Sequence, residues 1–144
     1  DFRVELAALK QRPCEPNLDR AAAELADYRA SGYHIAVAVL ETSELIGFIV
    51  ARVEGDVVWA ESLYVYPEHR RLGAASELYT RVEAIARELG SNTVYNWIHP
   101  NNQAMVGFLR SRGYDVLNLI KVRRRLPNEH VSGSIQVGSE RFRY

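Results

Sequence analysis

The sequence is poor in several features that would assign it to a special class. It has one cysteine, Cys14, among 144 residues, which excludes an internal disulfide framework. Its 18 basic and 18 acidic residues cancel, so no overall field attracts nucleic acid or an acidic membrane. Four scattered histidines give no metal-ligand spacing. We therefore expect no metal and neither a nucleic-acid nor a membrane partner.

Targeting signals are also missing. No apolar run approaches the roughly 18–20 residues that cross a bilayer, and no signal peptide is visible at residue 1. The apolar content of 47% and the charged content of 25% are ordinary for a globular protein. These features predict a cytoplasmic protein that folds as one domain over residues 1–144.

Hydrophobic spacing predicts a meander of three strands near the N-terminal side of the chain. The strands are expected at residues 35–40, 46–53 and 57–66, joined by tight turns, and the first is short and apolar enough to be buried. A helix over residues 17–31, capped by Asn17 and closed by Gly32, precedes them. Residues 1–11 fit either a helix or a strand.

The second half of the chain continues the alternation. It predicts helices at 74–89 and 101–112, and strands at 93–98, 114–126 and 135–144. The strand–helix–strand order across residues 57–98 requires a parallel pair with a right-handed crossover. The fold class is therefore α/β, with a mixed, mostly antiparallel sheet and helices on both faces.

Residues 60–90 are the stretch around which this pattern is organised. Trp59, Leu63 and Val65 alternate with Ala60, Ser62 and Tyr64, as in a strand, and Pro67 ends it. The helix that follows shows apolar residues at helical spacing and ends at Gly90. Between them lies a basic turn of small residues, Arg70, Arg71, Leu72, Gly73, Ala74, Ala75 and Ser76. Unpaired N–H groups at such a helix start form an anion site, which suggests a pyrophosphate-bearing ligand.

This stretch resembles the GNAT family, the acetyl-CoA-dependent N-acetyltransferases. The family motif R/Q-x-x-G-x-G/A, after a strand that ends near V-x-P-E, is matched by Arg70, Gly73 and Ala75 after Val65-Tyr66-Pro67-Glu68. The resemblance implies the GNAT fold, usually begun by a strand ahead of the first helix, and acetyl-CoA as co-substrate. It also implies that residues 70–76 hold the pyrophosphate. The pantetheine arm would pair, like a neighbouring strand, with the backbone of Leu63, Tyr64 and Val65.

Glu61 is an acidic residue inside an otherwise apolar strand. Burial would raise its pKa toward that of a useful general base. The resemblance adds that many family members carry a glutamate in this strand, where it deprotonates the acceptor amine directly or through water. The alternatives are a glutamate turned to solvent or one paired with an arginine.

Residues 101–114 resemble the second family motif, N-x-x-A-x-x-x-Y-x-x-x-G-F. Asn102 takes the asparagine position, where it caps the helix and contacts the cofactor arm. Met105 replaces the alanine, and Leu109 replaces the tyrosine that protonates the leaving thiolate in many members. Three interpretations follow. In the first, another side chain protonates the leaving thiolate, with Tyr64, Tyr66, Tyr114 and His99 as candidates. In the second, water protonates it, because a thiol with a pKa of ~8.5 needs little assistance at neutral pH. In the third, the site is degenerate.

The expected function is therefore N-acetyl transfer to a primary amine, by direct attack in a ternary complex. The alternatives are a non-catalytic CoA- or acyl-CoA-binding module and a transferase for a longer acyl-CoA. The acceptor, a small molecule or a protein or peptide amine, is not readable from loops 12–16, 28–34 and 127–134. Candidate pocket aromatics are Trp97, His99, Tyr33, His34, Tyr64 and Tyr66.

The last residues carry two further patterns. The basic run 121–125 would place Lys121, Arg123 and Arg125 on one solvated face of a strand. Residues 135–144 read as a terminal strand with a bulge or bend at Gly138-Ser139. A bare edge strand must be covered, and GNAT proteins often cover it by dimerising, so we expect a homodimer through this strand.

Overall fold

The chain forms two compact units in a computed structural model that describes residues 1–144. The first, here the sheet unit, comprises Asn17–Trp97. The second, here the terminal unit, comprises Asp1–Pro16 together with Ile98–Tyr144.

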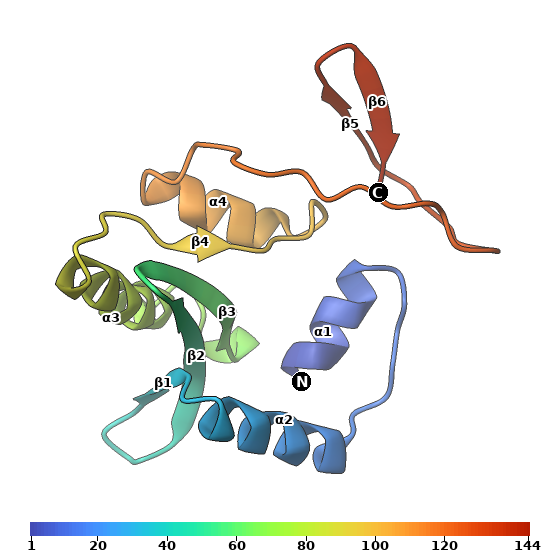
Figure 1. Cartoon of the computed structure of the whole chain (residues 1–144). Coiled ribbons are helices and arrows are strands. Elements are labelled where there is room, and N and C mark those ends of the chain that lie inside the picture. The colour runs from blue at the N-terminus through green and yellow to red at the C-terminus, as the bar shows by residue number, and fades with distance from the viewer. The chain divides into compact units, whose positions relative to one another are not determined.

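The sheet unit is built on four strands in the order β1-β2-β3-β4 (Figure 1). The antiparallel pairs of β1, β2 and β3 confirm the predicted meander. Strand β4 runs parallel to β3, as the crossover required, but it is shorter than the predicted strand at 93–98. The elements in chain order are α2 (Leu18–Ala30), β1 (His34–Val39), β2 (Leu45–Glu54), β3 (Val57–Val65), the short 3₁₀ helix η1 (Pro67–His69), α3 (Ala74–Glu88) and β4 (Tyr95–Asn96).

Local chemistry sets the ends of these elements where the sequence indicated. The Asn17 side chain accepts a hydrogen bond from the Arg20 N–H at 2.8 Å, which caps α2. Gly90 follows the last turn of α3 with a φ of 79°, the left-handed conformation of a helix-ending glycine. Gly47 of β2 lets two strands approach, since a Cβ there would lie 2.6 Å from the Tyr64 carbonyl oxygen.

A β-bulge at Glu61 changes the predicted face pattern of β3. Val50 pairs with Ser62 and Ala51 with Ala60, so Glu61 is an extra residue without an opposite partner. The sequence analysis predicts strict alternation along this strand, which would put Trp59 on the same face as Leu63 and Val65. That prediction is wrong, because the extra residue shifts the alternation and places Trp59 with Ser62 and Tyr64 instead.

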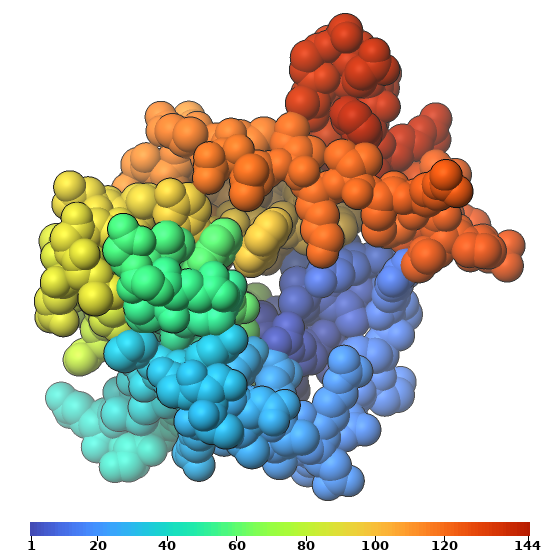
Figure 2. All heavy atoms as spheres, in the orientation of Figure 1, coloured from blue at the N-terminus to red at the C-terminus, as the bar shows by residue number.

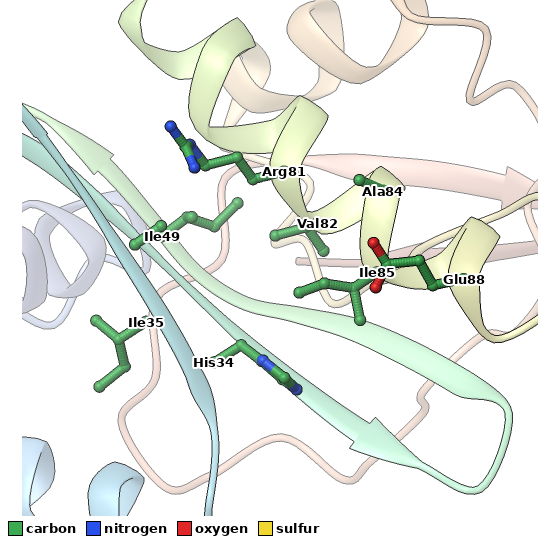
Figure 3. A pocket seen from close by; sticks show the side chains of 9 residues that line it. His34, Ile35, Ile49, Arg81, Val82, Ala84, Ile85 and Glu88 are labelled. Carbon is green, nitrogen blue, oxygen red and sulfur yellow. The ribbon is translucent and has the colours of Figure 1, made fainter.

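The two faces of this sheet are covered by different helices. Ile49 and Val82 meet between β2 and α3, and Figure 3 shows them pointing toward each other with Ile85 beside them. Tyr28 of α2 approaches Ser62 on the opposite face, with 3.4 Å between the two hydroxyl oxygens. Much of the core therefore lies between α3 and the sheet, while Val50 is buried on the face of Ser62. The largest fully buried side chains are Tyr79, Ile49, Leu78, Val50, Val58 and Val82.

Strand β1 is an exposed edge strand, not the buried strand that its apolar sequence predicted. Val37 and Val39 are more than half exposed, at 54% and 55%. The reason is position: β1 pairs with β2 alone, so its outer edge and part of its surface have no neighbour.

The terminal unit has little regular structure. It contains α1 (Phe2–Leu9), α4 (Gln103–Ser111), β5 (Ser134–Val137) and β6 (Glu140–Arg143). The helical alternative for residues 1–11 is thus confirmed. No helix of the protein is both long and apolar enough to cross a membrane.

Two predictions for the C-terminal part are wrong. Residues 114–126 form no strand, and almost all of them are exposed; Figure 2 shows this part of the chain in orange. Residues 134–143 form a hairpin rather than one strand, because Val137 pairs with Glu140 around Gly138-Ser139 and Gly138 has a φ of 59°. A positive φ at glycine fits a two-residue hairpin turn, so the break expected at Gly138-Ser139 as a bulge or bend is a full reversal of the chain.

Candidate active site

Glu61 occupies the bulge of β3, where its side chain shares a face with Trp59 and Ser62. Its carboxylate oxygen Oε1 accepts a hydrogen bond from Arg52 Nε at 2.7 Å, and 25% of the side chain is exposed. The carboxylate is therefore held in place by one oxygen and reachable by solvent. The arginine-paired alternative named from the sequence is the arrangement that the structure contains.

Arg52 of β2 is the functional residue that sequence reasoning missed. It forms ion pairs with both Glu54 and Glu61, and the hydrogen bond to Glu61 raises the pKa of Arg52 above its ordinary value. The sequence contains a signal for this pair. The tight turn at Gly55-Asp56 sets the register of the β2–β3 hairpin, and this register places Arg52 diagonally across from Glu61.

Aromatic side chains extend from Arg52 across the same face. Trp59 stands opposite Arg52 on one side and opposite Tyr95 on the other. Trp97 stacks on Trp59, with ring centroids 5.4 Å apart and planes 7° apart. The Trp59 indole Nε1 is buried without a hydrogen-bond partner, which is rare for a buried donor. We call Arg52, Trp59, Tyr95 and Trp97 the aromatic row.

The edge of β3 beyond Ala60 has no strand partner. Strand β4 pairs only with Trp59 and Ala60. The Tyr66 N–H donates to the Ile46 carbonyl on the β2 side at 3.0 Å, so the main-chain groups of Val65 and Leu63 point to the other edge. The main chain of Tyr64 points toward β2, and its side chain is buried. Leu63 and Val65, but not Tyr64, therefore present backbone groups at the open edge.

The basic turn lies between η1 and α3. Gly73 is the N-cap of α3 with a φ of 92°, and no side chain caps this helix start. Space is open around Gly73, because an added Cβ would meet no atom within 4 Å. Arg71, Leu72 and Gly73 are exposed, and Ala74, Ala75 and Ser76 follow as the first turn of the helix. An anion could approach these N–H groups without displacing any side chain.

Arg70 has a structural contact beside this turn. Its Nε donates to the Val65 carbonyl at 2.8 Å, and its guanidinium carbon lies 5.4 Å from the Tyr64 ring centroid. Arg70 thus ties the turn to the end of β3. One carbonyl of the open edge is already used by this bond.

The second sequence motif lies in the terminal unit. Asn102 caps α4 as predicted, since its side chain accepts a hydrogen bond from the Met105 N–H at 3.2 Å. Leu109, at the tyrosine position, is 3% exposed. A side chain at this position packs in the interior, which explains why leucine is stable there.

His99 precedes α4 in the same unit. Its Nδ1 accepts the Asn101 N–H at 3.2 Å, an assignment that places the ring proton on Nε2. Burial lowers the pKa of His99, and the charges of Lys10 and Arg123 lower it further. His99 is consequently a neutral hydrogen-bond donor near neutral pH.

The remaining predicted residues include an arginine of the basic run and a histidine of β1, and both are exposed. Arg123 does not lie on a strand face but pairs with Glu129, as does Arg12. A hollow of about 340 Å³ lies between α3 and strands β1 and β2 (Figure 3). It includes His34 from the predicted pocket aromatics but neither Glu61 nor the basic turn.

Comparison with known proteins supplies the context for this arrangement. Residues 4–114 match the profile of the acetyltransferase (GNAT) family. The aminoglycoside N-acetyltransferase AAC(6')-Iy, solved with a bisubstrate analogue and with CoA, is 24% identical with a TM-score of 0.60, over 79% of this chain and 84% of that one.

Two further solved structures are similar. AAC(6')-IG of Acinetobacter haemolyticus is 20% identical with a TM-score of 0.61, over 83% of this chain and 90% of that one. Nourseothricin acetyltransferase is 25% identical with a TM-score of 0.52, over 55% of this chain and 48% of that one. The α/β fold with its mixed, mostly antiparallel sheet is shared with these proteins.

Proposed function

Because this chain belongs to the acetyltransferase (GNAT) family, whose profile covers residues 4–114, we propose that it transfers the acetyl group of acetyl-CoA to a primary amine by direct attack in a ternary complex. The observation that carries the proposal is the position of Glu61. Its carboxylate stands at a bulge, where the paired part of β3 gives way to an open edge that leads to the basic turn.

In this reaction Glu61 accepts the proton that the amine loses as its nitrogen attacks the thioester carbon. The N–C bond forms, the C–S bond breaks, and sulfur leaves as the coenzyme A thiolate. The backbone N–H of Leu63 or Val65 at the open edge stabilises the negative charge on the carbonyl oxygen. Arg52 holds one oxygen of Glu61, which leaves the other to receive the proton.

Coenzyme A would be held by two features of the sheet unit. The N–H groups of residues 71–76 would bind the pyrophosphate, and the open edge of β3 would pair with the pantetheine arm. The exposed turn and the open space at Gly73 fit such a ligand.

Protonation of the thiolate needs no dedicated acid in this proposal. Leu109 carries no proton, and a thiolate with a pKa near ~8.5 can take one from water. The matching test is the pH dependence of kcat, which should then lack a basic limb from an enzyme acid.

Glu61→Gln tests the proposed base. The amide keeps the size of the side chain and can still contact Arg52, but it cannot accept the proton, so kcat should fall by about 10²–10⁴ while CoA affinity barely changes. Glu41→Gln, in the exposed turn between β1 and β2, is the control and should retain kcat. Wild-type kcat with an unchanged pH–rate profile in Glu61→Gln would remove Glu61 from the mechanism.

A second candidate function is a module that binds CoA or acyl-CoA without turnover, and the buried Leu109 favours it. Thiol release from acetyl-CoA against a panel of amines separates the two. CoA binding without thiol release, for any amine and for any acyl chain length, would establish the module. Release only with longer acyl-CoA donors would establish a different acyl transferase.

The acceptor that we propose is a small-molecule amine. The AAC(6') enzymes and nourseothricin acetyltransferase, which share this fold, are named for small molecules. A protein or peptide amine is the competing class, and acetylation of a lysine peptide but of no small amine would select it.

We also propose a homodimer that forms through the hairpin β5–β6. An isolated two-stranded hairpin is only marginally stable, and both of its edges are unpaired here. Pairing with a second copy would cover one edge. Light scattering at micromolar protein should report about twice the 16.3 kDa chain mass, and a concentration-independent monomer would contradict the dimer.

A further inference from the structure

We infer that the acceptor amine is an organic cation that carries a ring and no carboxylate, and that its ring rests on Trp97 of the aromatic row. The inference rests on the proposed function, because it takes Glu61 as the point where the amine nitrogen reacts. It goes further in naming the chemistry of the acceptor and the surface that selects it.

The aromatic row lies next to the proposed reaction centre. Trp59 is opposite Arg52, and Arg52 holds Glu61 at 2.7 Å, so indole and carboxylate share one face of the sheet. Trp97 covers Trp59 in parallel stacking and is itself 57% exposed. A ligand whose nitrogen is at Glu61 therefore has an accessible indole within the same row.

The electrostatics of the row favour a cation. Arg52 pairs with both Glu54 and Glu61, so these three side chains together carry one net negative charge. The faces of indole rings are also negative and attract organic cations. An ammonium ion is therefore drawn to the row both by the excess carboxylate and by the exposed ring.

The same charges disfavour a carboxylate on the acceptor. The guanidinium of Arg52 is the cation of this row, and two carboxylates already neutralise it. An amino-acid acceptor would bring a third carboxylate to this cluster.

The protein offers a direct optical probe of this surface. Its two tryptophans are Trp59 and Trp97, so all tryptophan fluorescence arises from the row. The probes are phenethylamine, phenylalanine and hexylamine, each titrated with and without CoA. Phenethylamine differs from phenylalanine by the carboxylate and from hexylamine by the ring.

Phenethylamine should quench or shift the fluorescence at concentrations about tenfold lower than either of the other two amines. In steady-state assays with acetyl-CoA its KM should be lower by a similar factor. Equal affinity for phenethylamine and phenylalanine, or tighter binding of hexylamine, would overturn the inference.

Two variants at position 97 separate stacking from folding. Trp97→Ala should raise the KM for phenethylamine about tenfold and the KM for hexylamine, which has only its ammonium to interact with the indole, by about twofold or less. Trp97→Phe, which keeps a ring, should raise the KM for phenethylamine only about threefold. If Trp97→Ala does not fold, Trp97→Phe alone decides. An unchanged ratio of the KM for phenethylamine to the KM for hexylamine in Trp97→Phe overturns the inference.

The failures of the two proposals are distinguishable. Amine binding in the expected order without any thiol release contradicts acetyl transfer but leaves the ring-cation surface in place. Thiol release with all three amines at equal KM supports acetyl transfer and overturns the surface. Release with a lysine peptide alone also overturns it.

Discussion

The sheet unit and the terminal unit bury side chains to very different extents. Every buried apolar side chain except Leu109 lies within residues 17–97. Both units expose large apolar residues, such as Leu18 and Leu72 in the sheet unit and Val116 and Leu117 in the terminal unit, so the units differ in what they bury. The difference follows from backbone pairing, because paired strands give helix α3 a continuous surface to cover and an irregular chain does not.

The terminal unit is held by a few side-chain contacts. Glu129 accepts hydrogen bonds from Arg123, Arg12 and the Leu126 N–H. The Asn101 side chain donates to the Leu9 carbonyl at 2.8 Å, which joins α1 to the start of α4. Rigid positions for chemistry are thus available chiefly in the sheet unit, which contains Glu61, the open edge and the basic turn.

The largest expected effect tests the proposal that CoA binds at the basic turn of the sheet unit. Gly73→Glu places a carboxylate in the open space at the start of α3, where it would repel the pyrophosphate, so CoA affinity should fall by about a hundredfold or more. Gly90→Glu is the matched control, because Gly90 also has a positive φ and open space around it.

Both variants should show similar losses of thermal stability, and calorimetry with CoA should distinguish them. Asn102→Ala, at the corresponding helix start of the terminal unit, should weaken CoA only a few-fold. Loss of CoA binding in Asn102→Ala but not in Gly73→Glu would contradict the proposed pyrophosphate site at the start of α3.

The second effect concerns stability. Ile49→Ala removes a side chain that is 1% exposed, and should lower the free energy of unfolding by about 2–5 kcal/mol. Ile120→Ala, in the terminal unit, removes the same atoms from a side chain that is 48% exposed. It should change the free energy of unfolding by less than about 0.5 kcal/mol. Urea denaturation measures both, and equal losses would show that the terminal unit is packed as tightly as the sheet.

A smaller effect is expected at Leu109, the buried residue of the terminal unit. Leu109→Tyr adds volume to a filled site and should destabilise the protein by about 1–3 kcal/mol. If water protonates the thiolate, the new phenol should change kcat less than about tenfold. Turnover that appears only in this variant would favour the binding module over the enzyme.

The smallest effect is local and depends on pH. Arg123 and the Leu126 N–H lower the pKa of Glu129 from 4.5 to about 2. Because the folded pKa is depressed, this contribution to stability is complete above about pH 4.5 and is lost as the pH falls toward 2. The protection of the Leu126 amide, its exchange rate compared with that of an unstructured peptide at the same pH, should fall over that interval. Glu129→Gln should abolish this pH dependence, and its persistence in the variant would contradict the assignment.

The sequence predicted the sheet unit well, because its signals are local and mutually consistent. Asn17, Gly32, Pro67 and Gly90 mark element ends by backbone chemistry that does not depend on distant contacts. The hairpin turn at Gly55-Asp56 sets the register of β2 and β3 in the same way. The fold class and the family followed from this region.

The errors arose where sequence patterns depend on neighbours. Residues 114–126 have the apolar content of a strand, but no partner strand pairs with them, and β1 is apolar although its outer edge is bare. To predict the Arg52–Glu61 pair, the register of β2 and β3 must be known as well as the residue types. Leu109 was identified as a departure, but its burial depends on packing that spacing alone does not reveal.

The bulge at Glu61 accounts for the geometry of β3 in one further respect. An added residue increases the local twist and bends its strand away from a straight neighbour. Strand β4 stops pairing at Ala60, the residue directly before the bulge. The inserted residue thus lies at the point where the two parallel strands stop pairing, and it carries the carboxylate that Arg52 of β2 binds. Deleting Glu61 would remove the acid and the bulge in one step and would restore strict alternation along β3.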